Sequence, residues 1–576
     1  MVESGEFWNK TRSELAGNRF SACSRLISCY QMRRKNIWKK RVIMSIKNVS
    51  LLKTSVSIAA ISGLLILGGC KGGDKAGSSL SAQELSVLSL DKNNGKVFGS
   101  YFETGACTSN EQEALGALAG LGLGENGDQG ITFSKREANG ATISYSDLKM
   151  ASSGSDDISV KSAVFHCAGM TNENPSFKRV DLKDLKISED GANINIGTLV
   201  VADASGSMAN AVIEEMLGGS TIDLADGFQF PAITASDVTM NIEDMDFSAK
   251  SFAFGHKATE DDNNFGDMMI EDVSFKMLEP DTSEEITIDF EGLNIRNFNM
   301  DSSVEGFLAG VSGSSDFNVF DSFTFGKKPY DEFSVGKFKM NSSFLTVDLE
   351  GMDGKATEKG GIITIKQNMD PLSINILEAA ADMPDFAEAY QQLKSLGFEN
   401  MTFLASSESK IDSSKDTYTV SDGRFIMKDA FTLKMDYQTS GLATVEASLK
   451  NMTEDELLQN PLKAYEGLKI NNLKVTLEDQ SILERSIKLA ADMTGQSEDQ
   501  LKSMAALGAA GAGLAATNDF EAKLYVDTAT AFAEFINKGG SLTIEMNPQT
   551  PLGIGSFIES GDLDPETLGF SARQSN

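Results

Sequence analysis

The chain has 576 residues, with 51 Lys and Arg against 83 Asp and Glu, and its net charge is −32. A chain this acidic repels nucleic acid and anionic surfaces. It has only 2 histidines and 5 cysteines, which leaves few ways to build a catalytic triad or a zinc site, and it has no glycine loop of the kind that holds phosphate. We therefore expect a protein that is not an enzyme, binds no nucleic acid and has no cofactor.

Residues 1–43 differ in character from the rest of the chain. They contain ten Lys or Arg and both tryptophans, Trp8 and Trp38. One interpretation is a basic arm for nucleic acid or membrane. We favour another, in which these residues are spurious upstream sequence and the protein starts at Met44, because a basic extension would obstruct the export signal that follows.

Residues 44–69 have the layout of a signal peptide. Lys47 and Lys53 precede an apolar run that begins at Val56 and is too short to span a bilayer. The run ends in Leu67-Gly68-Gly69-Cys70, which resembles the cleavage site of bacterial lipoproteins. This resemblance implies that Cys70 carries acyl chains such as palmitate. The alternative is that Cys70 follows an uncleaved apolar anchor or a core helix.

In bacterial lipoproteins an Asp after the cysteine tends to hold the protein in the inner membrane. Lys71 occupies that position here, so the resemblance implies the outer membrane, with the protein facing the periplasm or the surface. The expected mature chain begins with a flexible tether over residues 70–82 and has 39 Lys and Arg against 80 Asp and Glu, a net charge of −41. We interpret the charge as an aid to solubility or a salty habitat. Binding of divalent cations or a basic partner is the alternative, but no calcium-loop spacing occurs.

Two cysteines remain for a structural role. Cys107 and Cys167 form an even pair in an oxidising compartment, which predicts a disulfide. Such a bond would contribute about 4 kcal/mol in the chain-entropy model. Two free buried thiols are the alternative. His166 beside Cys167 lacks the second cluster of ligands that a zinc site requires.

Residues 83–478 are dominated by alternating apolar and polar residues, the period of strands with one apolar and one wet face. The clearest segments are 192–201, 285–300, 333–340, 343–349, 362–365, 431–437 and 468–477. The predicted fold class is mainly β: an elongated antiparallel sheet, a sandwich or a curled trough of one-sided strands, with a helical C-terminal region.

A loose internal repeat runs through these strands. A small or acidic residue precedes an alternating apolar pair at 147–150, 184–187, 244–247, 272–275, 292–295 and 472–475. The spacing between copies is irregular, so we interpret them as diverged strand-turn units and not as a strict solenoid period.

Helices are predicted in fewer places. One is an insertion near 384–397 that ends at Gly397. Residues 479–576 form a mostly helical C-terminal region, with helices at 482–494 and 519–538 and a capping box at 497–500 that begins another. A strand over 542–546 follows the last of them.

The most specific motif is Asp203-Ala204-Ser205-Gly206-Ser207, between an apolar strand and an amphipathic segment. It resembles the metal-ion-dependent adhesion site of von Willebrand factor type A domains. That resemblance implies that Asp203, Ser205 and Ser207 hold Mg²⁺. The surrounding alternation does not suit the doubly wound sheet of that family, and the other interpretation is a strand end, a turn and a helix N-cap.

The one-sided strands of residues 130–478 resemble, in texture, the β-rich envelope proteins of the AsmA-like group. This resemblance implies a curled sheet that presents an apolar groove to lipid. Our leading hypothesis is a lipid-anchored envelope protein, not an enzyme, that binds lipid or another apolar ligand, or other envelope proteins. A metal-dependent adhesion module is the alternative.

The signal peptide gives the first prediction. Mature protein should lack both tryptophans and carry acyl chains on Cys70, because cleavage falls after Gly69. Mass spectrometry of the membrane fraction tests this. A peptide containing Trp38 in the intact protein would contradict it.

Overall fold

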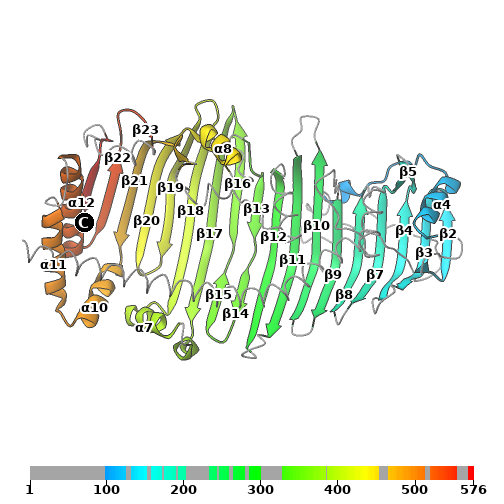
Figure 1. Cartoon of the computed structure of the whole chain (residues 1–576), viewed down its shortest axis with the longest axis horizontal. Helices are drawn as coiled ribbons and strands as arrows, with labels where there is room; N and C mark the ends of the chain where they lie inside the picture. The colour runs from blue at the N-terminus through cyan, green and yellow to red at the C-terminus, as the bar shows by residue number, and fades with distance from the viewer. Residues whose placement is uncertain are drawn as a thin grey trace, which may run out of the picture.

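The computed structural model describes residues 98–124, 131–151, 157–171, 174–189, 192–202, 232–242, 245–258, 264–278, 284–299, 327–383, 386–452, 463, 465–512, 519–553 and 568–575. Over this part of the chain the protein is mainly β, as predicted. Its strands form one antiparallel sheet of 22 strands, laid side by side along the long axis of the molecule (Figure 1).

The strands of the sheet are β1 (Ile131–Thr132), β2 (Lys135–Asn139), β3 (Thr142–Ala151), β4 (Asp157–His166), β7 (Arg179–Glu189), β8 (Ala192–Ala202), β9 (Ala232–Ile242), β10 (Met245–Ala258), β11 (Asn264–Leu278), β12 (Glu285–Asn299), β13 (Glu332–Val335), β14 (Phe338–Asn341), β15 (Leu345–Leu349), β16 (Met352–Lys359), β17 (Ile362–Ile376), β18 (Asn400–Asp412), β19 (Thr417–Met427), β20 (Phe431–Ser440), β21 (Lys469–Asp479), β22 (Ser541–Met546), β23 (Leu552–Gly553) and β24 (Ser571–Ser575). A separate small sheet contains β5 (Gly169–Thr171) and β6 (Asn174–Ser176).

The helices are α4 (Glu111–Gly120), α7 (Ala387–Leu396), α8 (Leu442–Asn451), α10 (Ile482–Thr494), α11 (Glu498–Ala512), α12 (Asp519–Lys538) and the short 3-10 helix η2 (Glu378–Asp382).

The sheet is a meander in which pairing follows chain order. From β3 to β12 each strand of the sheet pairs antiparallel with the one before and the one after it. β13 and β14 lie end to end along β12, and β15 and β16 lie end to end along β17. The 22 paired strands therefore form one continuous sheet that extends along the molecule (Figure 1), so the elongated sheet predicted from the sequence is correct and the sandwich is not.

Pairs of mostly polar residues interrupt the alternation of apolar and polar side chains, and the pairs on neighbouring strands lie next to each other. On either side of each pair the apolar residues point to the same face of the sheet. The pairs, which we call the doublet line, are Ser146-Asp147, Lys161-Ser162, Lys183-Asp184, Gly197-Thr198, Ser236-Asp237, Lys250-Ser251, Glu271-Asp272, Glu291-Gly292, Gly336-Lys337, Glu350-Gly351 and Asp370-Pro371. Successive side chains of a strand point to opposite faces. A strand that is interrupted by a polar pair therefore needs one extra residue there, so that the apolar side chains before and after the pair point to the same face of the sheet.

On alternate strands, one residue of the polar pair is an Asp with a left-handed backbone conformation, which accommodates the extra residue. Asp147, Asp184, Asp237 and Asp272 have φ between 45° and 52°. Asp tolerates this region because its short polar side chain can bond locally. Gly197, between two of these strands, leaves room for the side chain of Asp237, since a Cβ there would lie 2.9 Å from the Cβ of Asp237.

The doublet line explains the loose repeat in the sequence. The copies that begin at Asp147, Asp184, Asp272 and Gly292 all start on this line. A further copy, Asp237-Val238-Thr239-Met240, was missed. Asp244, proposed as a copy, lies outside the described residues, and Asn472 lies beyond β17, where the doublet line ends.

The predicted helices are present with close boundaries. α10 and α12 match residues 482–494 and 519–538, and α7 ends at Gly397, whose φ is 68°. Ser497 and Gln500 form the predicted capping box at the start of α11. α4 and α8 were not predicted. The predicted strands also needed correction, because 333–340 is broken into β13 and β14, and 362–365 is the start of the much longer β17.

The first described residues cross the polar face of the sheet. Phe98 packs against Ala253 and Met269, and the Tyr101 ring fits over Gly255, where a Cβ would lie 2.5 Å from the ring. The Tyr101 hydroxyl donates to Asp267 Oδ2 at 2.9 Å. Burial, followed by the charge of Asp267, raises the pKa of Tyr101. The described segment around Phe98 and Tyr101 therefore lies on the polar face of the sheet.

The doublet line gives the second prediction, which concerns Asp184. Asp184→Val should lower the free energy of unfolding by about 2 kcal/mol, because a left-handed backbone costs a residue with a Cβ roughly 1–2 kcal/mol. Asp184→Asn is the matched control. Asn also tolerates the left-handed backbone, so this variant loses only the exposed ion pair between Asp184 and Lys161, at 3.3 Å. Such an exposed ion pair contributes at most about 1 kcal/mol. Urea unfolding measures both, and equal losses would contradict the strain argument.

Candidate functional site

One face of the sheet has uninterrupted rows of apolar side chains. In-register neighbours form two rows that flank the doublet line. The Leu148 row consists of Leu148, Val160, Leu185, Ile196, Val238, Ala249, Val273, Phe290, Phe338, Leu349, Leu372, Phe403, Met427 and Phe431. The Tyr145 row consists of Tyr145, Ala163, Leu182, Leu199, Ala235, Phe252, Ile270, Leu293, Val335, Met352, Met369, Ala405, Phe425, Leu433, Leu477 and Leu542.

An outer row lies beyond each of these. The Met150 row runs from Met150 on β3 to Met401 on β18, and the Ile143 row runs from Ile143 on β3 to Phe333 on β13. No member of the four rows is charged. We call the surface formed by these rows the apolar face and the opposite surface the polar face.

Burial of the apolar face changes along the molecule. Near its N-terminal end Tyr145, Leu148 and Leu182 are each 0% exposed. From β12 onward most members of the rows are only half-buried, including Phe290, Phe338 and Leu372. The face is thus a closed core at one end and a partly open surface along the middle of the sheet.

Helix α4 closes the N-terminal end. Its residues Ala114 and Leu118 pack in one cluster with the buried strand residues. The Tyr145 hydroxyl donates to the carbonyl oxygen of Leu123 at 2.8 Å, and burial raises the pKa of this phenol to about 12. Asn110 caps α4 and forms a capping box with Glu113.

A disulfide fixes this closure. The sulfur atoms of Cys107 and Cys167 lie 2.01 Å apart, and these are the two cysteines paired from the sequence. The Ser109 hydroxyl also donates to the carbonyl oxygen of Ala168 at 2.5 Å. The segment that leads into α4 is therefore tied to the end of β4 both covalently and by a hydrogen bond.

His166, adjacent to this disulfide, belongs to a buried charged cluster. Its Nε2 lies 3.0 Å from Asp181 Oδ2, and Arg179 Nε donates to Asp181 Oδ1 at 2.6 Å. Arg179 also donates to the carbonyl oxygen of Phe102 at 3.2 Å. Burial favours the neutral carboxyl, but the bonds from His166 and Arg179 outweigh it and lower the pKa of Asp181. The cluster pairs its own charges and ties the N-terminal segment to the sheet.

Helices gather at the other end of the sheet. Phe398, Met427 and Ala430 form a small core with Ile482 at the start of α10. Beyond this core α10 to α12 carry exposed apolar side chains, with Met493 67% and Leu507 72% exposed. In Figure 1 these helices lie beside the last strands, at the opposite end from α4.

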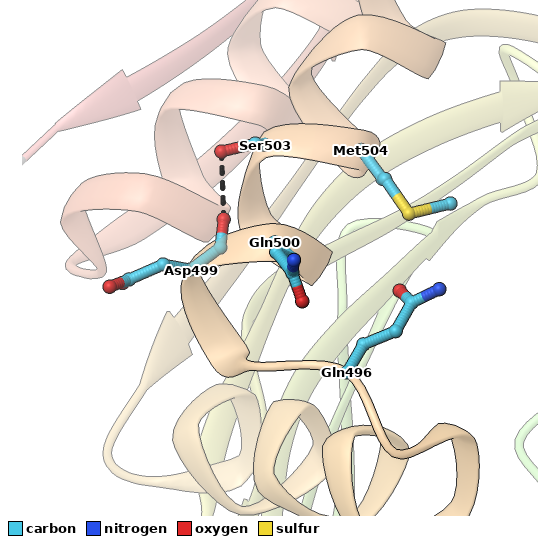
Figure 2. Close-up of a pocket in the computed structure, with 5 residues that line it drawn as sticks. All are labelled: Gln496, Asp499, Gln500, Ser503 and Met504. Atoms are coloured by element: carbon cyan, nitrogen blue, oxygen red, sulfur yellow. Dashed lines mark hydrogen bonds between the residues drawn. The ribbon is translucent and has the colours of Figure 1, made fainter.

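A surface pocket of about 460 Å³ lies at the junction of α10 and α11, lined by Gln496, Asp499, Gln500, Ser503 and Met504 (Figure 2). The Ser503 hydroxyl donates to the Asp499 carbonyl oxygen at 2.7 Å, one turn back in the helix. The side-chain oxygen of Gln496 is buried without a partner. The pocket is lined by a helix start and one loop residue, which offers no converging set of catalytic groups.

The motif at Asp203, Ser205 and Ser207 lies outside the described residues, as does Cys70. The strand before the motif is informative, because β8 pairs antiparallel with both β7 and β9. A von Willebrand factor type A domain has a doubly wound, mostly parallel sheet. The resemblance therefore does not extend to the fold. Among the residues that the structure describes, no group of three His, Cys, Asp or Glu side chains is placed to hold a metal ion.

Comparison with known proteins adds little. A family model described only as "Uncharacterized protein" matches residues 424–574, from the middle of β19 to the end of β24. No curated protein matches the chain. In the described part of the chain, no helix is both long and apolar enough to cross a membrane.

The third prediction concerns Asp203. If Asp203, Ser205 and Ser207 form a strand end and a helix cap, Asp203→Ala should cost about 1 kcal/mol and Mg²⁺ should not change the melting temperature. Thermal melting with and without Mg²⁺ measures both. A saturable rise in melting temperature that Asp203→Ala abolishes would contradict this and favour the metal site, because a ligand that binds only the folded state stabilises it by mass action.

Proposed function

We propose that this protein is a lipid-anchored component of the bacterial outer membrane that binds acyl chains along its apolar face, and that it is not an enzyme. The single observation that carries the proposal is the half-buried, uncharged surface formed by the four rows from β12 onward. Exposed apolar surface of more than a few hundred Å² is rare on soluble monomers and marks interaction sites.

The physical driving force for binding is removal of this surface from water. Each Å² of apolar surface that a ligand covers contributes about 25 cal/mol. A long hydrocarbon chain suits such a surface, because the in-register rows run across the strands without a charged side chain. Neighbouring strands are about 4.8 Å apart, so a chain lying along a row would touch several strands.

The placement of the first described residues supports this function. The N-terminal segment is fixed to the polar face by Tyr101 and Asp267, so a tether to Cys70 would leave the apolar face uncovered. The residues between Cys70 and Phe98 can span at most about 95 Å when fully extended. The lipid anchor on Cys70 and the location in the outer membrane rest on Leu67-Gly68-Gly69-Cys70 and Lys71.

The fourth prediction tests binding on the apolar face. Met340→Glu combined with Ile374→Glu should weaken binding of the hydrocarbon fluorophore diphenylhexatriene by at least about tenfold, because an acyl-like ligand would have to bury carboxylates. Both residues belong to the Met150 row, with Val347 between them. Fluorescence titration measures the affinity, and mass spectrometry of co-purified lipid should show the same loss.

Thr346→Glu combined with Ser373→Glu is the matched control. These residues lie on the same strands as Val347 and Ile374 but on the polar face, and the change in charge is the same. The control should bind the fluorophore as the wild type does. Equal binding by both double variants, with melting temperatures close to the wild type, would contradict the proposal.

A further inference from the structure

The Ile143 row changes its chemistry after β13. Phe333 on β13 is paired with Gly354 on β16, and Gly354 is paired with Gln367 on β17, so the position that continues the row holds an amide. On β19 and β20 the same face carries Tyr418 and Tyr437, the latter paired with the apolar-face residue Val420. A polar island therefore interrupts an otherwise apolar surface. We call Tyr330, Gln367, Tyr418 and Tyr437 the tyrosine cluster.

Tyr330 reaches the island from the segment just before β13, two residues ahead of its first residue. Its hydroxyl accepts a hydrogen bond from Gln367 Nε2 on β17 at 3.0 Å. Its ring packs edge-on against Phe333, with centroids 5.0 Å apart. Phe333 in turn lies over Gly354, where any Cβ would meet the ring at 2.2 Å. The absence of a side chain at Gly354 thus lets the two rings lie across β16.

Tyr418 and Tyr437 form the other half of the cluster. Their ring centroids are 6.0 Å apart, with the ring planes tilted by 56°. Burial, then the neighbouring Tyr418, raises the pKa of Tyr437 to about 12. Burial also raises the pKa of Tyr330, and Tyr418 contributes to that rise. Tyr330 and Tyr437 therefore stay uncharged at neutral pH, and all three phenols can both donate and accept hydrogen bonds.

The charged residues of the same strands point the other way. Lys366 forms an ion pair with Glu408 at 2.9 Å, and Arg424 with Asp422 at 2.6 Å, all on the polar face. Among the described residues none of the four rows carries a cation. The whole chain has a net charge of −32. An anionic group at the tyrosine cluster would therefore meet the net negative charge of the chain without a cation in the neighbouring rows.

We propose that the tyrosine cluster binds the uncharged polar end of an acylated ligand, such as its glycerol hydroxyls or ester carbonyls, while the hydrocarbon chain lies along the neighbouring apolar rows. This inference rests on the proposed function, since it assumes that the apolar face binds hydrocarbon. Phenols and an amide match hydroxyl and ester groups in donor and acceptor capacity. The half-buried position of the phenols leaves them accessible to a ligand on the face.

The test uses full-length protein and three probes: monooleoylglycerol, oleate and diphenylhexatriene. Tyr418→Phe combined with Tyr437→Phe should weaken monooleoylglycerol binding by about tenfold, because a hydrogen bond contributes roughly 0.5–1.5 kcal/mol net, which is about 2- to 12-fold in affinity. Diphenylhexatriene has no polar end, so its affinity should not change. Tyr390→Phe, a buried tyrosine on α7 outside the cluster, is the control and should bind all probes as the wild type does.

Oleate separates an uncharged headgroup from an anionic one. It has the same chain as monooleoylglycerol, and the wild type should bind it at least about tenfold more weakly. Equal or tighter binding of oleate would overturn the neutral-headgroup inference. Unchanged monooleoylglycerol affinity in the double variant, or equal weakening of both uncharged probes, would also overturn it while leaving the apolar face intact as a binding surface. Failure of the wild type to bind any probe would instead overturn the proposed function.

Discussion

The two-residue period of a β-strand is the constraint on which this structure depends. A long strand normally keeps one face apolar only while its alternation is unbroken. The strands of the sheet from β3 to β12, and β17, each break it once, and between β13 and β14 and between β15 and β16 the break separates two short strands. The break occurs at the same level in every strand, so the doublet line crosses the sheet without separating the apolar rows on either side. Left-handed aspartates such as Asp184, and glycines such as Gly292, make the break possible.

The same face has two different environments along the molecule. At the N-terminal end it is the inside of a conventional core, where α4, a disulfide and the charged cluster around Asp181 hold a cover in place. From β12 onward the face keeps its composition, but most members of the rows are only half-buried. There the ladder of backbone hydrogen bonds and contacts between neighbouring rings, such as Phe290 and Phe338, hold the strands together. If the proposed function holds, stability and binding capacity are located in different parts of one sheet.

Local sequence patterns predicted the elements well and their assembly poorly. Alternation identified the strands, and caps and glycines identified α7, α10 and α12. Alternation indicates, however, only that one face of a strand is apolar. It does not indicate what covers that face, so a sandwich and a single sheet were equally compatible with the sequence. The doublet line was seen only as an irregular repeat, because loops of unequal length separate its copies, and Asp237 was missed. The tyrosine cluster combines a hydrogen bond between Tyr330 and Gln367 with a ring contact between Tyr418 and Tyr437, and these residues are too far apart in the chain for a local sequence pattern to reveal them.

The meander topology bears on how such a molecule forms and changes in evolution. Because each strand pairs mainly with its chain neighbours, contacts are local, and hairpins can add one after another to an existing edge as the chain emerges. Duplicating or deleting one hairpin would alter the length of the sheet by two strands, or about 10 Å, without disturbing distant pairings. Length is thus a property that selection can adjust in discrete steps, and the aspartates repeated from Asp147 to Asp272 mark where successive hairpins join the same line.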